Sequence, residues 1–202
     1  MIDLRSKVRE VPDFPEPGIG FKDITPLLLD PLALKQAVDE LASWTAERKP
    51  DLVLGAEARG FLLGAAIACE VGCGFVPARR PGKLPPETVS ARYVLEYGEN
   101  ALEVNADAIA KGARVVIHDD VLATGGTVEA IAGLVENLGG HVVGVNFVIE
   151  LSFLNGREKL GGEIVGVNFV IELAFLNGRA KLAAYDVFSL LTYETADQDA
   201  PV

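Results

Sequence analysis

Along the first 140 residues, short apolar runs alternate with longer segments in which apolar side chains recur every three or four positions. The runs have the length of buried strands, and the longer segments have the period of helices. This rhythm predicts an α/β fold with a mainly parallel, twisted sheet that is flanked by helices. The predicted strands are 52–57, 73–80 and 113–120, and the predicted helices are 34–47, 60–70 and 127–140.

Two further segments complete the predicted domain. Residues 80–90, RPGKLPPETVS, are too rich in proline and glycine for regular structure, and the alternating residues after them predict a hairpin-like excursion. Residues 185–193, YDVFSLLTY, form the last predicted strand. A chain of this length and organisation is expected to fold as a single domain over 1–202.

A nearly identical internal repeat interrupts the rhythm. Residues 138–159 and 160–181 agree at 18 of 22 paired positions, and each copy holds the strand VGVNFVIEL. Two copies are too few for a solenoid, so they indicate a tandem duplication. The apolar strand of a spare copy would aggregate in water. We therefore expect it to be ordered as an added strand, against a partner subunit or by exchange between subunits, with copy one entering the sheet.

Composition narrows the function classes. Half of the residues are apolar, and the net charge of −11 leaves no basic surface of the kind that coats nucleic acid. The sequence has no apolar window long enough for a membrane span and no signal peptide, so we expect a cytoplasmic protein without nucleic-acid or membrane partners. Cys69 and Cys73 lack neighbouring metal ligands, and we interpret them as small buried apolar residues.

The most specific chemical motif is VVIHDDVLATGGT at 115–127. A buried strand delivers Asp119 and Asp120 at its carboxyl end, which is the edge of a parallel sheet where ligands bind. The glycines and threonines that follow run into a helix N-terminus, which favours a phosphate. Because the adjacent acids would repel a bare phosphate, the motif favours a ligand with hydroxyl groups beside its phosphate, namely a ribose 5-phosphate.

This string resembles the phosphoribosyl-diphosphate (PRPP) signature of the type I phosphoribosyltransferases. Other segments resemble the adenine phosphoribosyltransferase branch of that family, over essentially the whole chain once one 22-residue copy is removed. The resemblance implies the type I fold with a small hood and a mobile loop. The matching segments are FPEPGIGFKDITPLL at 14–28 (base binding), GAEARGF at 55–61 (pyrophosphate loop), and RRPGKLP at 79–85 followed by SARY and LEYG (catalytic loop).

The resemblance implies a role for each matching residue at the PRPP site. Asp119 and Asp120 would hold the ribose hydroxyls and stabilise the positive charge that develops on the sugar. Arg59, Arg79 and Lys83 would face the diphosphate, and Mg²⁺ would be held mainly through PRPP, with no direct metal ligand from the protein. The 5-phosphate would bind on Ala123, Thr124, Gly125, Gly126 and Thr127.

An adenine site is implied as well. Phe21 would stack on the base, while Gly20 and Lys22 would contact it mainly through backbone groups. The leucine that closes over the base would be Leu151 in copy one or Leu173 in copy two.

Three further residues bear on the chemistry. Glu96 would be the loop acid that protonates adenine, and Tyr97 beside it belongs to the PRPP- and AMP-binding set. His118 precedes the acids at a position where the family has an aliphatic residue. It is either tucked under the sheet or tunes Asp119.

The resemblance implies transfer of the 5-phosphoribosyl group from PRPP to adenine, giving AMP and pyrophosphate in purine salvage, with Mg²⁺ as cofactor and a homodimer as the assembly. Two alternatives stay open. One is a phosphoribosyltransferase for a different base, against which the FKDITPLL segment argues. The other is a protein of this fold that binds PRPP or nucleotide with weak or no turnover, because the repeat lies beside the predicted base pocket.

Overall fold

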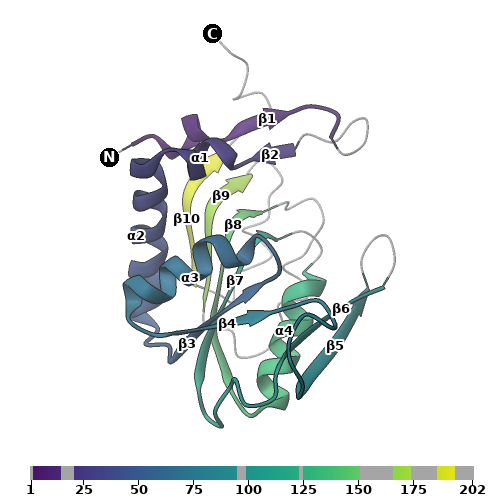
Figure 1. Ribbon diagram of the computed structural model, residues 1–202. Helices are drawn as coiled ribbons and strands as arrows, with labels where there is room; N and C mark the ends of the chain where they lie inside the picture. The colour runs from purple at the N-terminus through teal and green to yellow at the C-terminus, as the bar shows by residue number, and fades with distance from the viewer. Residues whose placement is uncertain are drawn as a thin grey trace.

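A six-stranded, fully parallel sheet forms the centre of the computed structural model, in the order β10-β9-β8-β7-β3-β4 (Figure 1). The structure describes residues 2–14, 21–94, 99–122, 125–150, 166–173 and 186–193. The sheet confirms the predicted α/β class. Its strands are β3 (Leu52–Ala56), β4 (Gly74–Ala78), β7 (Arg114–Leu122), β8 (His141–Glu150), β9 (Gly166–Leu173) and β10 (Asp186–Tyr193).

Helices cover both faces of this sheet (Figure 1). One apolar cluster joins α1, α2 and α3 to one face, and a second joins α4 and the β5–β6 hairpin to the other. Along β3, Leu52 and Leu54 belong to the α4 cluster and Val53 to the opposite one, as expected for a strand that is buried on both sides. These elements are α1 (Thr25–Leu29), α2 (Pro31–Glu47), α3 (Gly60–Val71), α4 (Gly126–Asn137), β5 (Thr88–Val94) and β6 (Glu99–Asn105).

Two expectations about single helices can be compared with the structure. Across the described ranges, no helix is both long enough and apolar enough to cross a bilayer. Cys69 is exposed and Cys73 half-buried, so the prediction that both are buried is wrong. The reason is that Cys69 lies off the stripe of α3 that packs on the sheet, which contains Leu63 and Ile67.

The two copies of the repeat supply neighbouring strands. β8, from copy one, pairs with β7, and β9, from copy two, lies between β8 and β10. Their register places identical residues opposite each other, such as Asn146 and Asn168, or Phe147 and Phe169. The second copy is therefore ordered as an added strand, which is one of the three arrangements expected from the sequence. Copy one is the copy that pairs with β7.

A small antiparallel pair outside the main sheet, together with α1, forms the hood that the resemblance implied. The pair consists of β1 (Arg9–Val11) and β2 (Phe21–Asp23), and a short 3₁₀ helix, η1 (Leu4–Lys7), precedes it. Neither strand has a hydrophobic alternation of its own, because each has only three residues.

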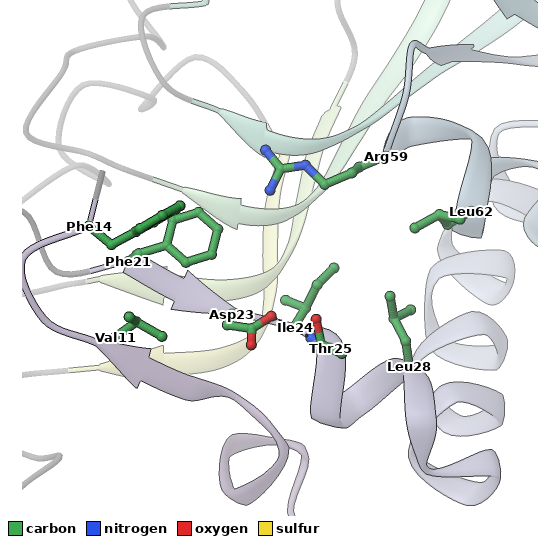
Figure 2. A pocket seen from close by; sticks show the side chains of 9 residues that line it. All are labelled: Val11, Phe14, Phe21, Asp23, Ile24, Thr25, Leu28, Arg59 and Leu62. Atoms are coloured by element: carbon green, nitrogen blue, oxygen red, sulfur yellow. Dashed lines mark hydrogen bonds between the residues drawn. The ribbon is translucent and has the colours of Figure 1, made fainter. Parts of the chain in front are cut away.

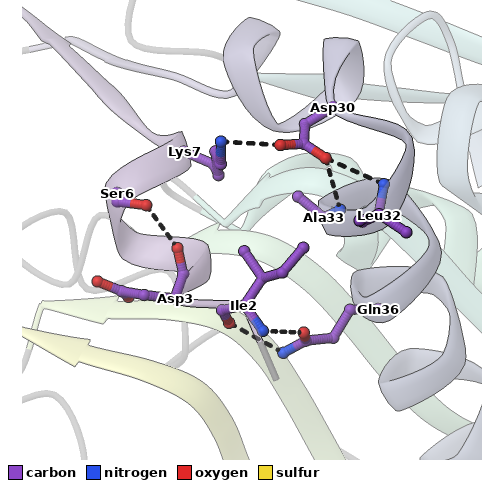
Figure 3. A network of polar contacts seen from close by, with 8 residues as sticks. All are labelled: Ile2, Asp3, Ser6, Lys7, Asp30, Leu32, Ala33 and Gln36. Atoms are coloured by element: carbon purple, nitrogen blue, oxygen red, sulfur yellow. Dashed lines mark hydrogen bonds and ion pairs between the residues drawn. The ribbon is translucent and has the colours of Figure 1, made fainter.

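Polar contacts attach the N-terminal segment to α2 (Figure 3). Asp30 caps α2, because its Oδ1 accepts two backbone N–H groups of the first turn at 3.0 and 3.2 Å. The other carboxylate oxygen of Asp30 lies 2.8 Å from Lys7 Nζ. Gln36 exchanges hydrogen bonds of 2.7 and 3.2 Å with the backbone of Ile2. Since this segment runs directly into β1, these contacts hold the hood against the sheet domain.

Candidate active site

Asp119 and Asp120 are the sixth and seventh of the nine residues of β7, so they lie before its end. The strand continues to Leu122, so the predicted end at residue 120 was two residues too early. β3 pairs with β7 only as far as Gly55 and His118. Beyond that pair, the edge of β7 is open toward the loop that connects β3 to α3, and the two acids lie at this opening.

Arg59, the last residue of that loop, meets the acids with an ion pair. Its Nε lies 2.7 Å from Asp120 Oδ2, and Asp120 is only 7% exposed. The backbone N–H of Asp120 donates to Asp119 Oδ1 at 2.8 Å. The structure therefore brings together three residues that the sequence assigned to one site from two separate segments.

Full ionisation of the acidic pair would place more negative charge there than Arg59 balances. Burial raises the pKa of Asp119, and the charge of Asp120 raises it further, while Arg59 acts in the opposite direction. The ionised form of Asp119 is therefore disfavoured until a ligand donates hydrogen bonds to it or brings positive charge. A sugar with free hydroxyl groups meets this requirement, and a bare anion does not.

The start of α4 is arranged for an anion. Gly125 is the N-cap of α4 and has a φ of +80°, a conformation that residues with a side chain disfavour. Because this N-cap has no side chain, none occupies the backbone N–H groups of the first turn. Gly126 is buried and Thr127 half-buried. These features fit the expected 5-phosphate site.

An open cavity of about 490 Å³ lies between the hood and the start of α3 (Figure 2). Phe14 and Phe21 form part of its wall, with their rings edge to face and the ring centroids 5.1 Å apart. Figure 2 shows the Arg59 side chain extending from α3 toward this aromatic wall. Arg59 thus belongs both to the cavity and to the acidic pair. The other lining residues are Val11, Asp23, Ile24, Thr25, Leu28 and Leu62.

Phe21 and Lys22 point to different sides of β2. Phe21 lines the cavity, whereas Lys22 places its Nζ 2.7 Å from Glu10 Oε2 on β1. Successive residues of a strand alternate in this way. A contact between Lys22 and a base in the cavity would therefore use backbone atoms, as the resemblance implies.

The two predicted loop cations begin at the end of β4. Arg79 Nε lies 3.2 Å from Glu57 Oε2, and one terminal nitrogen of Arg79 donates to the Lys83 carbonyl at 3.4 Å. The Lys83 side chain is exposed. Arg79 is thus held beside the loop that carries Arg59. Glu57 and Phe14 lie in the segments 55–61 and 14–28 that resemble the family, but neither has an individual role there, because their contacts with Arg79 and Phe21 exist only in the folded chain.

Several predicted site residues lie outside the described part of the chain, so their roles stay predictions. Within that part, no group of three or more His, Cys, Asp or Glu is arranged to hold a metal ion. Leu173 is described only as the last backbone position of β9. The residues outside are Gly20, Glu96, Tyr97, Ala123, Thr124 and Leu151.

Comparison with known proteins shows which family the chain is similar to. A family model for the phosphoribosyl transferase domain matches residues 28–158. The adenine phosphoribosyltransferase of Alkaliphilus metalliredigens is 57% identical over 157 residues, which cover 78% of this chain and 92% of that protein. The enzyme of the same name from Gloeobacter violaceus is 55% identical over 158 residues, with the same coverage.

Solved structures agree in fold. A crystal structure of adenine phosphoribosyltransferase from Thermoanaerobacter pseudethanolicus superposes with a TM-score of 0.74 at 47% identity and covers 95% of this chain and 98% of its own. The Saccharomyces cerevisiae enzyme, in a complex with an imino-altritol bisphosphate and adenine, has a TM-score of 0.75 at 40% identity, with 80% of this chain and 94% of that chain covered. The chain belongs to the phosphoribosyl transferase domain family, within its adenine phosphoribosyltransferase branch.

Proposed function

We propose that the protein transfers the 5-phosphoribosyl group of PRPP to adenine and releases pyrophosphate, which supplies AMP by purine salvage. One observation carries this proposal: Arg59 both lines the cavity beside Phe21 and pairs with Asp120. A nucleotide needs this combination, because an apolar slot for the base must adjoin acceptors for the ribose hydroxyls. The adenine phosphoribosyltransferases among the relatives support adenine as the base.

The acidic pair acts on the sugar. Asp119 and Asp120 accept hydrogen bonds from the ribose hydroxyls, and their negative charge stabilises the positive charge that develops on the sugar as the diphosphate departs. The 5-phosphate binds residues 123–127, where the backbone N–H groups at the start of α4 fix its position. Since both ends of the ribose phosphate are then held, the reacting carbon is presented to the base in a defined orientation.

Three cations bind the leaving group. Arg59, Arg79 and Lys83 contact the diphosphate and offset the charge that it gains on departure. The carboxylates of Asp119 and Asp120 give the site the negative, oxygen-rich surroundings that Mg²⁺ prefers, and the ion would be held there mainly through PRPP. When bound, Mg²⁺ neutralises diphosphate charge and so makes pyrophosphate a better leaving group.

Adenine lies in the cavity. It stacks on Phe21, and the backbone of Gly20 and Lys22 contacts its edge. Glu96 protonates one ring nitrogen of adenine while the ring nitrogen that attacks the sugar releases its own proton to solvent, and the first nitrogen returns its proton to Glu96 once the bond to the sugar has formed. The other residues proposed for this end of the site are Tyr97, and either Leu151 or Leu173.

The same proposal extends to organisation. The chain acts as one phosphoribosyltransferase domain over 1–202, with 138–159 and 160–181 as a tandem duplicate, and as a homodimer in the cytoplasm. The near-identity of the two copies supports the duplication. The β7–β8 pairing supports activity in its presence, because that pairing involves copy one alone.

A base panel tests the function. The purified protein is incubated with Mg²⁺, PRPP and adenine, guanine or hypoxanthine, and AMP and pyrophosphate are quantified. We expect adenine-dependent AMP formation, and a decrease in kcat of about 100-fold or more in Asp120→Asn, which lacks the negative charge beside the sugar. Product from another base and none from adenine would contradict the choice of base. Calorimetric binding of PRPP without product from any base would identify a binding protein instead, an outcome that the inserted β9 keeps open.

A further inference from the structure

Glu57 lies directly after β3, at the start of the loop that ends with Arg59. Its backbone N–H donates to the Ala78 carbonyl at 2.9 Å, which extends the β3–β4 pairing by one step. Its carboxylate Oε2 then accepts from the backbone N–H of Arg80 at 2.9 Å and lies 3.2 Å from Arg79 Nε. One carboxylate oxygen therefore fixes both residues at the beginning of the predicted catalytic loop.

The contact is charged and mostly shielded from solvent. The side chain of Glu57 is 15% exposed and that of Arg79 is 35% exposed. The hydrogen bond from the Arg80 backbone, together with the Arg79 side chain, holds the pKa of Glu57 below its ordinary value although burial acts against this. Glu57 is thus an anion at neutral pH, and its hydrogen bonds are of the stronger, charge-assisted kind.

The backbone of Arg79 is held independently of this contact. Arg79 exchanges two backbone hydrogen bonds with Glu103 on β6, of 2.8 and 2.7 Å. The guanidinium contacts the Glu57 carboxylate at 3.2 Å and the Lys83 carbonyl at 3.4 Å, and its Cζ lies 6.0 Å from the centroid of the Phe61 ring. Removal of the Glu57 carboxylate would therefore leave the Arg79 backbone in place and release the direction of its side chain.

The point of attachment decides what Arg79 can still bind. A guanidinium has one N–H at Nε and four at its two terminal nitrogens, and the terminal pair binds phosphate oxygens two at a time. Glu57 meets Arg79 at Nε. Asp120 meets Arg59 at Nε in the same way, at 2.7 Å. Both arginines are thus held by a carboxylate at the one nitrogen that a diphosphate needs least.

We propose that Glu57 is a positioning residue for the diphosphate: through Nε it orients the Arg79 guanidinium toward the loop that carries Arg59, so that both arginines present their terminal nitrogens to the same ligand. This inference deepens the proposed function and rests on it. Glu57 itself does not touch the substrate. Its removal therefore weakens the binding of PRPP and leaves the binding of adenine unchanged.

Steady-state kinetics of Glu57→Ala and Glu57→Gln test the proposal. Glutamine keeps an acceptor oxygen for both donors, whereas alanine removes it. In Glu57→Ala we expect KM for PRPP to rise about ten-fold and kcat to fall, because Arg79 also offsets the charge of the departing diphosphate, with KM for adenine within about two-fold of wild type. In Glu57→Gln the rise should stay within about three-fold. Glu136→Ala, which removes an exposed carboxylate from the far end of α4, is the matched control and should change none of these values.

Other outcomes would overturn the inference. A KM for PRPP in Glu57→Ala that is unchanged or lower would mean that Glu57 merely competes with the diphosphate for Arg79. Equal rises in KM for PRPP and for adenine would indicate general damage to the site. If Glu57→Ala does not fold, the effect of Glu57→Gln on KM for PRPP is measured twice, once in the otherwise wild-type protein and once in the Arg79→Lys variant. Lysine has no Nε branch, so the proposal requires the effect of Glu57→Gln to disappear in Arg79→Lys.

Failure of the proposed function would be recognised separately. If the wild-type protein binds PRPP but forms no AMP, the proposed reaction is wrong, and the Glu57 variants are then compared by the calorimetric dissociation constant for PRPP, with the same fold-changes expected. Wild-type protein that does not bind PRPP at all would overturn both proposals.

Discussion

Replacement of His118 by leucine tests a buried polar network beneath the acidic pair. His118 is fully buried on β7, and its Nδ1 contacts Asn146 Oδ1 on β8. Asn146 Nδ2 donates to Thr45 Oγ1 on α2 at 3.0 Å, so the amide oxygen faces His118, whose Nδ1 therefore carries the proton. The three side chains join β7, β8 and α2 by hydrogen bonds that an apolar residue cannot replace.

At neutral pH the variant is expected to be less stable. In His118→Leu the amide oxygen of Asn146 loses its partner, and a buried polar group without a partner costs about 1–3 kcal/mol. Among the described residues, His118 Nε2 has no hydrogen-bond partner, so its removal offsets part of this loss. We expect a net decrease of about 1–2 kcal/mol in the free energy of unfolding at pH 7.5.

At acidic pH the difference in stability between wild type and His118→Leu should disappear. Burial lowers the pKa of His118 from 6.5 to about 4, so the native ring stays neutral while the unfolded ring takes up a proton below pH 6.5. Wild-type stability therefore falls as the pH decreases from 6.5 to 4, by about 3 kcal/mol in total and about 2 kcal/mol by pH 5. Leucine does not titrate, so the variant does not lose this stability. The raised pKa of Asp119 is common to both proteins and therefore does not contribute to the difference between them. At pH 5 the variant should equal or exceed the wild type in stability.

Urea unfolding at pH 7.5 and pH 5 measures both quantities. Trp44 is the single tryptophan, is buried, and precedes Thr45 on α2, so its fluorescence reports on the region concerned. His118→Leu combined with Asn146→Leu is the control, because removal of both partners leaves no orphaned amide and should restore stability at pH 7.5. A difference between wild type and His118→Leu that is the same at the two pH values would refute the reasoning.

Gly60→Ala is expected to lower the free energy of unfolding by about 1–3 kcal/mol, because a Cβ there would lie 2.8 Å from the His118 carbonyl oxygen. Urea denaturation measures the loss, and wild-type stability would contradict the close packing of α3 on β7. Phe21→Leu should raise KM for adenine about ten-fold through lost stacking, whereas Lys22→Ala should change it less than two-fold; a larger effect of Lys22 would contradict its placement beside Glu10. Deletion of residues 160–181 should leave a cooperatively folding protein, since β7–β8 pairing does not involve them. Circular dichroism during heating measures this, and loss of the cooperative transition would show that β9 is required.

The central layers of the fold could be predicted because their elements are local. β3, α3, β4 and α4 each carry their own apolar run or helical period, and the observed bounds lie within a few residues of the predicted ones. The hood could not be predicted in this way. β1 and β2 are three residues each and are held by distant contacts, such as the pair of Arg9 and Asp23, so only the resemblance indicated that a hood exists.

The candidate site could be predicted as residue types but not as contacts. Asp119 and Asp120 could be identified because they are adjacent acidic residues within one recognisable motif. The attachments of the arginines, to Asp120 and to Glu57, join different segments and exist only once the parallel strands place their loops together. The same reasoning explains His118, for which the sequence left two interpretations and whose partners come from two other elements.

The like-with-like pairing of β8 and β9 bears on how two copies of one segment fit side by side in a single sheet. Each strand of a parallel sheet offers its next neighbour the same ladder of donors and acceptors that it uses itself, so a second GVNFVIEL meets an edge that already suits it. β9 lies between β8 and β10, which are thus two strand spacings of about 4.8 Å apart, and the pairing among β4, β3 and β7 does not involve β9. The second copy therefore widens the sheet on the β8 side, and β8 separates it from the opening beside β7 at which Asp119 and Asp120 lie.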